Sequence, residues 1–279
     1  MALRIERTES NMADVKVNGV ILTGKRAVHN QFLMFACVDN KAMIDIDGKA
    51  MIQHVIDALN ESQYVKNIYL VVPEDFEAAS FDSKKPLSTI PSGDTAVESL
   101  LNAIHGSGEA EKVIITTCDN PLFRGFMLDE FIQRCLTTNA DFCYSVGRES
   151  VISASYPEVK RTYVQAKDDG YTGANVYFVD KKDFSVDEEM LVKIDSYRKT
   201  PWRYVRLIGK RTLVKFALKR ITLEDVEKRA SEIIGCKFRL IPMPFPVCGI
   251  DVDKPSDLVL VRKLMKGSAW QQTLLRMAS

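Results

Sequence analysis

The strongest indication of the fold is the segment VIITTCDNP, at residues 113–121. Its first five residues are apolar or β-branched, which predicts a strand buried on both faces of a sheet. Pro121 ends the strand, because proline offers no N–H to a sheet ladder. Asp119 therefore follows the carboxyl end of a predicted central parallel strand, the edge at which open α/β sheets bind ligands. A carboxylate there can hold a divalent cation beside a phosphate site or simply cap the turn, and the stretch alone favours neither.

The composition fits one large α/β domain or two small ones, because 46% of the 279 residues are hydrophobic. The formal net charge is +1, so no overall field points to nucleic acid as a partner. The six cysteines contain no CxxC pair, which predicts reduced thiols in a cytoplasmic protein rather than a zinc or disulfide framework. Residues 1–16 mix charges of both signs, and we expect a flexible N-terminus without a signal peptide or membrane span.

Strand and helix patterns alternate from residue 17 to residue 146. This alternation predicts a parallel sheet with helices on both faces. Asp94 or Thr95 can cap the second helix, Asp47-Gly48 predicts a turn, and residues 74–91 are predicted to form a loop. The predicted strands are 17–22, 67–72, 113–117 and 141–146, and the predicted helices are about 50–62, about 95–104 and about 125–138.

The second half of the chain has a different pattern. Residues 162–166 and 174–179 predict a hairpin-like pair. Helical patterns fill 184–234, and a late strand at 238–241 leads through the stiff connector PMPFP to a helix at about 255–266. We therefore expect a flexible segment at 1–16, a single domain at 17–266 with a helical insertion at about 184–234, and a C-terminal tail at 267–279.

Three segments point to one family. They are KAMIDIDGKAMI at 41–52, CDNP at 118–121 and GIDVDKPSDL at 249–258. Together they resemble the MobA-like nucleotidyltransferases, which are related to molybdopterin guanylyltransferase. The first matches the family's K-x-L-x-x-x-x-G-x-P-x-I segment, the second its D-x-P turn, and residues 251–258 its D-V-D-T-P-E-D-L segment. The resemblance implies the nucleotide-diphospho-sugar transferase (GT-A-like) fold, a three-layer α/β/α Rossmann-like arrangement with a mixed central sheet.

The phosphate loop departs from this family's pattern. The family has a loop of the form G-G-x-G-x-R after the first strand, whereas this chain has Leu22-Thr23-Gly24-Lys25-Arg26, in which only Gly24 clearly fits. Glycines in such a loop let backbone N–H groups approach phosphates closely. The reduced loop therefore leaves open a nucleotide-binding regulatory protein without turnover. A glycosyltransferase that uses a nucleotide-sugar is a further alternative.

The resemblance implies a Mg²⁺- or Mn²⁺-dependent nucleotidyltransferase. It would move an NMP from an NTP to a small phosphorylated or hydroxylated acceptor and release pyrophosphate. The implied catalytic residues are Lys41, Asp119 and Asp253, of which the two aspartates would hold the metal, with Asp251 as a second candidate. The implied nucleotide-binding residues are Leu22, Thr23, Gly24, Lys41, Ser92, Gly93 and Cys118. The implied acceptor-binding residues are Lys160, Arg161, Gly173 and Asn175.

Each of these residue types also has a purely structural explanation. Lys41 can be a solvated surface lysine, Ser92-Gly93 an ordinary helix start and Gly173 a glycine at the start of a strand. The stretch 198–220 contains nine basic residues and no acidic one. It can be a helix with a solvated basic face, or a patch that receives an anionic acceptor or a membrane surface. The sequence does not predict an oligomeric state.

Overall fold

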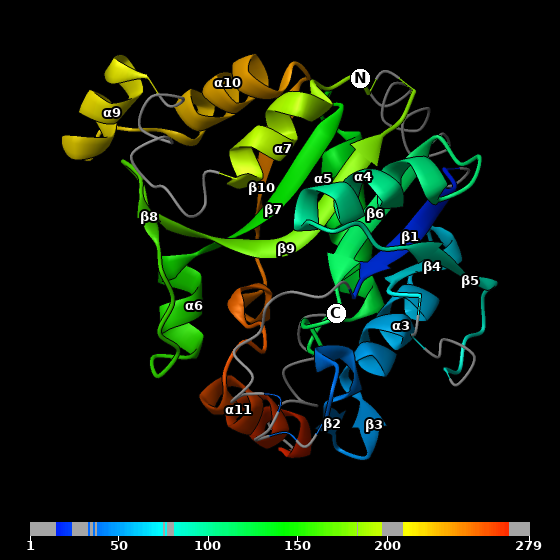
Figure 1. The fold of residues 1–279 in the computed structure, drawn as a ribbon. Helices are drawn as coiled ribbons and strands as arrows, with labels where there is room; N and C mark the ends of the chain where they lie inside the picture. The colour runs from blue at the N-terminus through cyan, green and yellow to red at the C-terminus, as the bar shows by residue number, and fades with distance from the viewer. Residues whose placement is uncertain are drawn as a thin grey trace, which may run out of the picture.

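The computed structural model describes residues 15–23, 33, 36, 38–74, 76, 81–182, 184–196 and 209–267. In this part of the chain an eight-stranded sheet has helices on both of its faces (Figure 1). The strand order is β10-β7-β9-β6-β1-β4-β5, and β8 pairs with β9 off this path. The strands of the sheet are β1 (Val17–Leu22), β4 (Val65–Val72), β5 (Leu87–Pro91), β6 (Lys112–Thr117), β7 (Phe142–Arg148), β8 (Val164–Gln165), β9 (Gly170–Asp180) and β10 (Phe238–Met243).

The described helices include two short 3₁₀ turns, one of which begins at the predicted site lysine. The helices are η1 (Lys41–Met43), α3 (Met51–Glu61), α4 (Ala96–Gly106), α5 (Gly125–Leu136), α6 (Glu149–Ser155), α7 (Glu188–Ser196), α9 (Lys210–Ala217), α10 (Leu223–Ile234), η4 (Pro246–Gly249) and α11 (Pro255–Lys266).

The centre of the sheet is formed by β1, β4 and β6, which run parallel to one another. Ile114 of β6 belongs to one hydrophobic cluster, whereas its neighbours Val113 and Ile115 belong to a second cluster. Because successive side chains of a strand point to opposite faces, β6 separates these two cores. All three side chains are completely buried, which confirms the prediction that VIITT forms a strand covered on both faces.

One long strand runs against its neighbours. β9 pairs antiparallel with β6 on one side and with β7 on the other, and β10 then pairs parallel with β7. β8 and β9 form the predicted hairpin, in which Val164 faces Tyr171. The sheet is therefore mixed but mostly parallel, which confirms the predicted α/β/α fold with a mixed central sheet.

A small hairpin connects Lys41 to the first long helix. β2 (Asp45–Ile46) and β3 (Lys49–Ala50) pair antiparallel around Asp47 and Gly48. These two turn residues have φ values of 56° and 81°, as a two-residue type I′ turn requires. The turn predicted from Asp-Gly is thus confirmed, although residues 41–43 before it form a 3₁₀ turn.

Two elements correct the sequence predictions. The loop predicted at 74–91 ends in β5, which pairs with β4 at the edge of the sheet. Only Ile90 is buried in this strand, so the sequence lacks the apolar run that would have indicated it. Helix α6 was also not predicted; it has a single fully buried residue, Ile152, and therefore a weak apolar stripe.

The predicted helical insertion contains α7, α9 and α10 within its described residues. Helix α10 covers the outer edge of β10, because Glu227 Oε1 accepts a hydrogen bond from Leu240 N at 2.8 Å and Ser231 Oγ accepts one from Phe238 N at 2.9 Å. An edge strand covered in this way offers fewer free backbone groups to other chains. In the basic stretch, residues 198–208 lie outside the described residues.

The cysteines and helix lengths add two observations. Among the described residues, Cys118, Cys135, Cys143, Cys236 and Cys248 are buried. No helix in the described ranges is both long enough and apolar enough to cross a membrane.

Candidate active site

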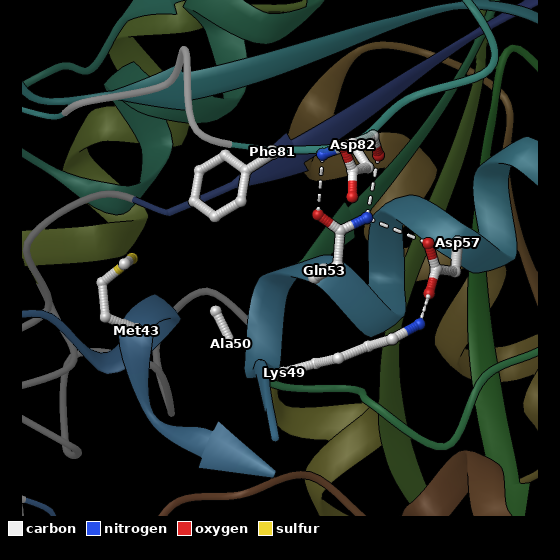
Figure 2. Close-up of a pocket in the computed structure, with 7 residues that line it drawn as sticks. All are labelled: Met43, Lys49, Ala50, Gln53, Asp57, Phe81 and Asp82. Carbon is white, nitrogen blue, oxygen red and sulfur yellow. Dashed lines mark hydrogen bonds and ion pairs between the residues drawn. The ribbon is translucent and has the colours of Figure 1, made fainter. Parts of the chain in front are cut away.

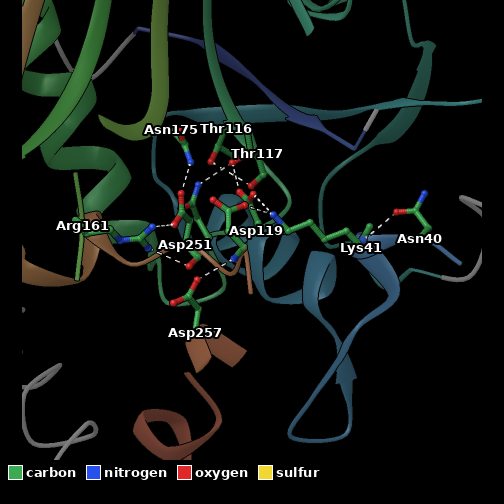
Figure 3. Close-up of polar contacts among 12 residues, drawn as sticks. Asn40, Lys41, Thr116, Thr117, Asp119, Arg161, Asn175, Asp251 and Asp257 are labelled. Atoms are coloured by element: carbon green, nitrogen blue, oxygen red, sulfur yellow. Dashed lines mark hydrogen bonds and ion pairs between the residues drawn. The ribbon is translucent and has the colours of Figure 1, made fainter. Parts of the chain in front are cut away.

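The predicted site residues meet beyond the carboxyl ends of β1 and β6. The chain leaves the two strands together, because Cys118 N donates to Leu22 O at 3.1 Å. The late segment also reaches this edge, where Val252 N donates to Asp119 O at 3.0 Å. Figure 3 shows the side chains of Lys41, Asp119 and Asp251 converging from separate parts of the chain.

Asp119 is buried and fixed in orientation. The hydroxyl of Thr117 donates to Asp119 Oδ1, and Asn120 Nδ2 donates to Thr117 Oγ1 at 2.9 Å. The second carboxylate oxygen, Oδ2, accepts from Lys41 Nζ at 2.6 Å. The turn after β6 therefore aims a preorganised carboxylate at the cation, and Asp119 does more than cap the turn.

Lys41 joins two carboxylates that are remote in sequence. Its Nζ lies 2.6 Å from Asp119 Oδ2 and 2.7 Å from Asp253 Oδ1, and only 10% of its side chain is exposed. Asn40 fixes the local turn by accepting from Ala42 N at 2.9 Å. Burial acts to lower the pKa of Lys41, but the two aspartates outweigh it and raise the pKa above the ordinary value. The explanation of Lys41 as a solvated surface lysine is wrong.

Asp253 is placed by the start of α11. Its backbone N–H donates to Asp257 Oδ2 at 3.2 Å, and Pro255 occupies the first turn of the helix. Its side chain is 46% exposed, in contrast to 5% for Asp119. The shared ammonium is therefore approached by one buried and one accessible carboxylate.

Asp251 has different partners. Arg161 Nη1 forms an ion pair with its carboxylate, and Asn175 Nδ2 donates to its Oδ2 at 3.0 Å. Burial raises the pKa of Asp251, although Arg161 opposes this effect. The carboxylate is thus held by an ion pair with Arg161 and a hydrogen bond from Asn175, which argues against Asp251 as a metal ligand in this arrangement.

Asp119 and Asp253 form a pair of carboxylates that fits a divalent cation. No group of three His, Cys, Asp or Glu side chains with metal-binding geometry occurs among the described residues. Mg²⁺ needs no such group, because it is commonly held by one or two carboxylates together with substrate phosphates and water. Since both carboxylates already contact one cation, the ammonium of Lys41, their donor atoms suit this type of site.

The predicted nucleotide-binding turns have mixed outcomes. Thr23 Oγ1 donates to Val71 O at 2.6 Å, and Gly24 lies outside the described residues. Gly93 N donates to Ser99 Oγ at 3.1 Å, and a Cβ on Gly93 would lie 2.3 Å from Glu98 Cβ. The helix start therefore explains this glycine by itself, and a nucleotide contact at Ser92-Gly93 stays a prediction.

The predicted acceptor residues also have structural contacts. A Cβ on Gly173 would lie 2.1 Å from the Tyr144 hydroxyl, so this glycine makes room for a tyrosine of the neighbouring strand. Arg161 and Asn175 turn to Asp251, whereas Lys160 is exposed. Acceptor binding by these residues stays a prediction.

Sequence reasoning did not single out three supporting residues. Thr117, Asn120 and Asp257 orient the two site carboxylates. The signal was present for two of them, because Asn120 lies inside the D-x-P turn and Asp257 inside the D-V-D-K-P-S-D-L segment. Thr117 offered no such signal, since threonine is an ordinary strand residue.

The order and directions of the strands define the class of fold as that of the nucleotide-diphospho-sugar transferases. Residues 19–181 match the family of the MobA-like NTP transferase domain, and the chain belongs to this family. No curated protein matches the sequence.

Solved structures agree with this assignment. A hypothetical transferase from Thermus thermophilus is similar at 25% identity with a TM-score of 0.75, covering 88% of this chain and 100% of that chain. CMP:2-keto-3-deoxy-manno-octonic acid synthetase complexed with CTP shares 17% identity and a TM-score of 0.53 over 90% and 98% of the respective chains. A 4-diphosphocytidyl-2C-methyl-D-erythritol synthase from Anaerococcus prevotii shares 10% identity and a TM-score of 0.55 over 91% and 99%. The last two show the fold alone.

Proposed function

We propose that the chain transfers a nucleotidyl group from an NTP to a small phosphorylated or hydroxylated acceptor and releases pyrophosphate, with Mg²⁺ or Mn²⁺ as cofactor. The observation that carries this proposal is the convergence of Lys41, Asp119 and Asp253 at the ligand-binding edge of the sheet. A bound divalent cation would supply charge neutralisation for the phosphates.

The chain's own residues have separate tasks in this reaction. Asp119 and Asp253 would hold the cation, and Asp119 keeps its orientation through Thr117. Lys41 would move from the carboxylates to the developing negative charge on the phosphates, because its ammonium lies beside the same site. Phosphoryl chemistry requires mainly positioning and charge neutralisation, which these three side chains can provide.

The acceptor is proposed to be anionic. Lys160 is an exposed cation, and its neighbour in sequence, Arg161, contacts the segment that carries Asp253 by donating to Asp251 O. Binding of an acceptor or a membrane surface by the basic stretch 198–220 also stays a prediction. The described part of this stretch includes α9. Within it, Lys215 pairs with Asp225 at 2.6 Å, so part of the basic charge is balanced internally.

Thermal denaturation with CTP, GTP, ATP and UTP, each with and without Mg²⁺, tests nucleotide binding. A nucleotide at 100 times its Kd should stabilise the protein by about 2.7 kcal/mol. Asp119→Asn and Asp253→Asn should lose the Mg²⁺-dependent part of this stabilisation, whereas Asp57→Asn should retain it. Asp57 is a suitable control because it also pairs with a lysine, Lys49, at 2.9 Å but on the surface.

Pyrophosphate release in a panel of phosphorylated acceptors then tests turnover. Release that depends on Asp119 supports nucleotidyl transfer. Nucleotide binding without release would support the regulatory alternative that the reduced loop at 22–26 suggests, and release of a nucleoside diphosphate from a nucleotide-sugar would support glycosyl transfer. Full activity of either aspartate variant would remove that residue from the site.

A further inference from the structure

Asn175 adopts an unusual backbone conformation in the middle of a strand. Its φ is 55°, although it is not glycine and lies inside β9. A non-glycine residue in the left-handed region is strained and persists only where the surroundings hold it there. The pairing of β9 with β7 also shifts register between Tyr144 and Val146, directly beside this position.

The neighbouring strand compensates for this irregularity. Ser145 Oγ donates to Val176 O at 2.9 Å and accepts from Val176 N at 3.1 Å, so the hydroxyl replaces the interrupted ladder contacts. Bulges of this kind redirect a side chain and often lie next to active sites. Here the redirected side chain is the amide of Asn175, which reaches Asp251.

Asp251 is held from two sides (Figure 3). Asn175 Nδ2 donates to Oδ2 at 3.0 Å, Arg161 Nη1 pairs with Oδ1, and Arg161 Nη2 donates to the backbone carbonyl of Asp251 at 3.0 Å. The side chains of Asp251 and Arg161 are only 16% and 15% exposed. These contacts fix both the side chain and the backbone of Asp251.

The segment after Asp251 carries this constraint to the reaction centre. The next residue, Val252, donates its N–H to Asp119 O at 3.0 Å. The residue after that, Asp253, contacts the same ammonium as Asp119. The two-residue separation leaves little freedom between the held carboxylate and the one that faces the site.

We propose that Asn175 and Arg161 are positioning residues that act through Asp251 to set the distance between Asp253 and Asp119. This inference rests on the proposed function, because it assigns the aspartate pair to a divalent cation. The two aspartates of Asp-Val-Asp then have different roles: Asp251 holds the segment in place, and Asp253 would bind the cation. Anchoring Asp251 also gives the left-handed Asn175 a reason, since a regular strand would direct its amide elsewhere.

Asn175→Gly tests the anchor without straining the backbone, because glycine tolerates a positive φ and only the amide is lost. Titration with Mn²⁺, followed by the electron paramagnetic resonance of the free ion, should show an affinity about tenfold weaker than wild type. Lys219→Gly is the matched control: Lys219 also has a positive φ of 52° but lies exposed beyond α9, so its variant should bind Mn²⁺ as wild type does. Arg161→Lys keeps the positive charge but loses the paired Nη1 and Nη2 donors, and it should also weaken Mn²⁺ binding.

A second measurement uses no metal. Amide hydrogen exchange of Val252 should become about tenfold faster in Asn175→Gly, because its bond to Asp119 opens more often, while the amide of Ile115 in β6 exchanges as before. Unchanged Mn²⁺ affinity together with unchanged Val252 exchange overturns the proposal. Faster Val252 exchange in a protein that binds no Mn²⁺ even as wild type would support the anchor and overturn the proposed metal site instead.

Discussion

At the scale of single residues, the candidate site depends on the Lys41 ammonium, which Asp119 and Asp253 share. Lys41 is buried with Asp119, whereas Asp253 remains accessible from solvent. A buried carboxylate that loses its partner cation pays the full cost of desolvation, so the lysine is needed for stability as well as for chemistry.

We predict that Lys41→Met lowers the free energy of unfolding by about 1–3 kcal/mol, because Asp119 loses a charged hydrogen-bond partner. The loss should shrink in Mg²⁺, which can take the place of the ammonium between the carboxylates. Since the pKa of Lys41 is raised, the difference from wild type should persist up to about pH 10, near the unfolded lysine pKa, and disappear only above the folded-state pKa. Turnover should fall as well.

Chemical denaturation with and without Mg²⁺ measures this effect, and Lys49→Met serves as its control. Lys49 pairs with Asp57 at the surface with 54% of its side chain exposed, so its removal should change stability by less than about 0.5 kcal/mol. A Lys41→Met effect as small as the control, or one that Mg²⁺ leaves unaltered, would show that the lysine and the metal do not share a position.

At the scale of elements, helices protect and delimit the sheet. Thr95, one of the two predicted caps, begins α4 with a capping box in which its side chain accepts from Glu98 N. Helix α10 covers the edge strand β10, where Glu227 accepts a hydrogen bond from Leu240 N. A groove beside the start of α3, lined by Met43, Gln53 and Phe81 among others, has its Gln53 amide bonded to Asp57 and Asp82 (Figure 2). The Gln53 amide is thus engaged by the protein itself.

We predict that Glu227→Gln becomes progressively more stable than wild type as the pH rises. Burial raises the pKa of Glu227, although Leu240 N–H and Arg239 oppose it, so the folded protein binds this proton more tightly than the unfolded chain. Wild type therefore loses stability as the pH rises from the unfolded-state glutamate pKa through the folded-state value, and glutamine removes that loss while it can still accept from Leu240 N.

Urea denaturation at about pH 4 and about pH 7 tests this prediction, since the two conditions bracket the unfolded glutamate pKa. Glu232→Gln, at an exposed position of the same helix, should show no such increase relative to wild type. An unchanged difference between Glu227→Gln and wild type at the two pH values would mean that Glu227 titrates alike in both states.

At the scale of the whole molecule, the candidate site combines Lys41 and Asp119 from the first half of the chain with Asp253 from its last segment. β10 pairs with β7, and the segment that follows it brings Asp253 to Asp119. The insertion between β9 and β10 packs on the same sheet through α10. These connections support one cooperative unit rather than a domain with an independent appendage.

We therefore predict that thermal unfolding proceeds in a single transition. Far-ultraviolet circular dichroism, which follows the helices, and near-ultraviolet circular dichroism, which follows packed aromatic side chains, should give the same midpoint. Aromatic packing reports on the far edge of the sheet, where Phe142 and Phe238 lie 5.7 Å apart between ring centroids. Two separate midpoints would instead identify the insertion at about 184–234 as an independently unfolding part.

The class of fold and the main residues of the candidate site could be predicted from the sequence alone. Its buried apolar runs, helix caps and Asp-Gly turn are local signals, so β1, β6, α4 and the β2–β3 turn could be predicted from neighbouring residues. The family resemblance selected Lys41, Asp119 and Asp253 for the same reason, because each lies in a short segment that carries its own pattern.

The contacts that bring these segments together could not be predicted from the sequence. Burial of Lys41, the separate role of Asp251 and the inward turn of Arg161 and Asn175 depend on contacts between residues up to 212 positions apart, which leave no local pattern. The edge strand β5 was hidden for a related reason: its pairing with β4 comes from backbone hydrogen bonds, which do not require an apolar side-chain pattern. Local propensity therefore specified the elements, and long-range electrostatics and packing specified the site.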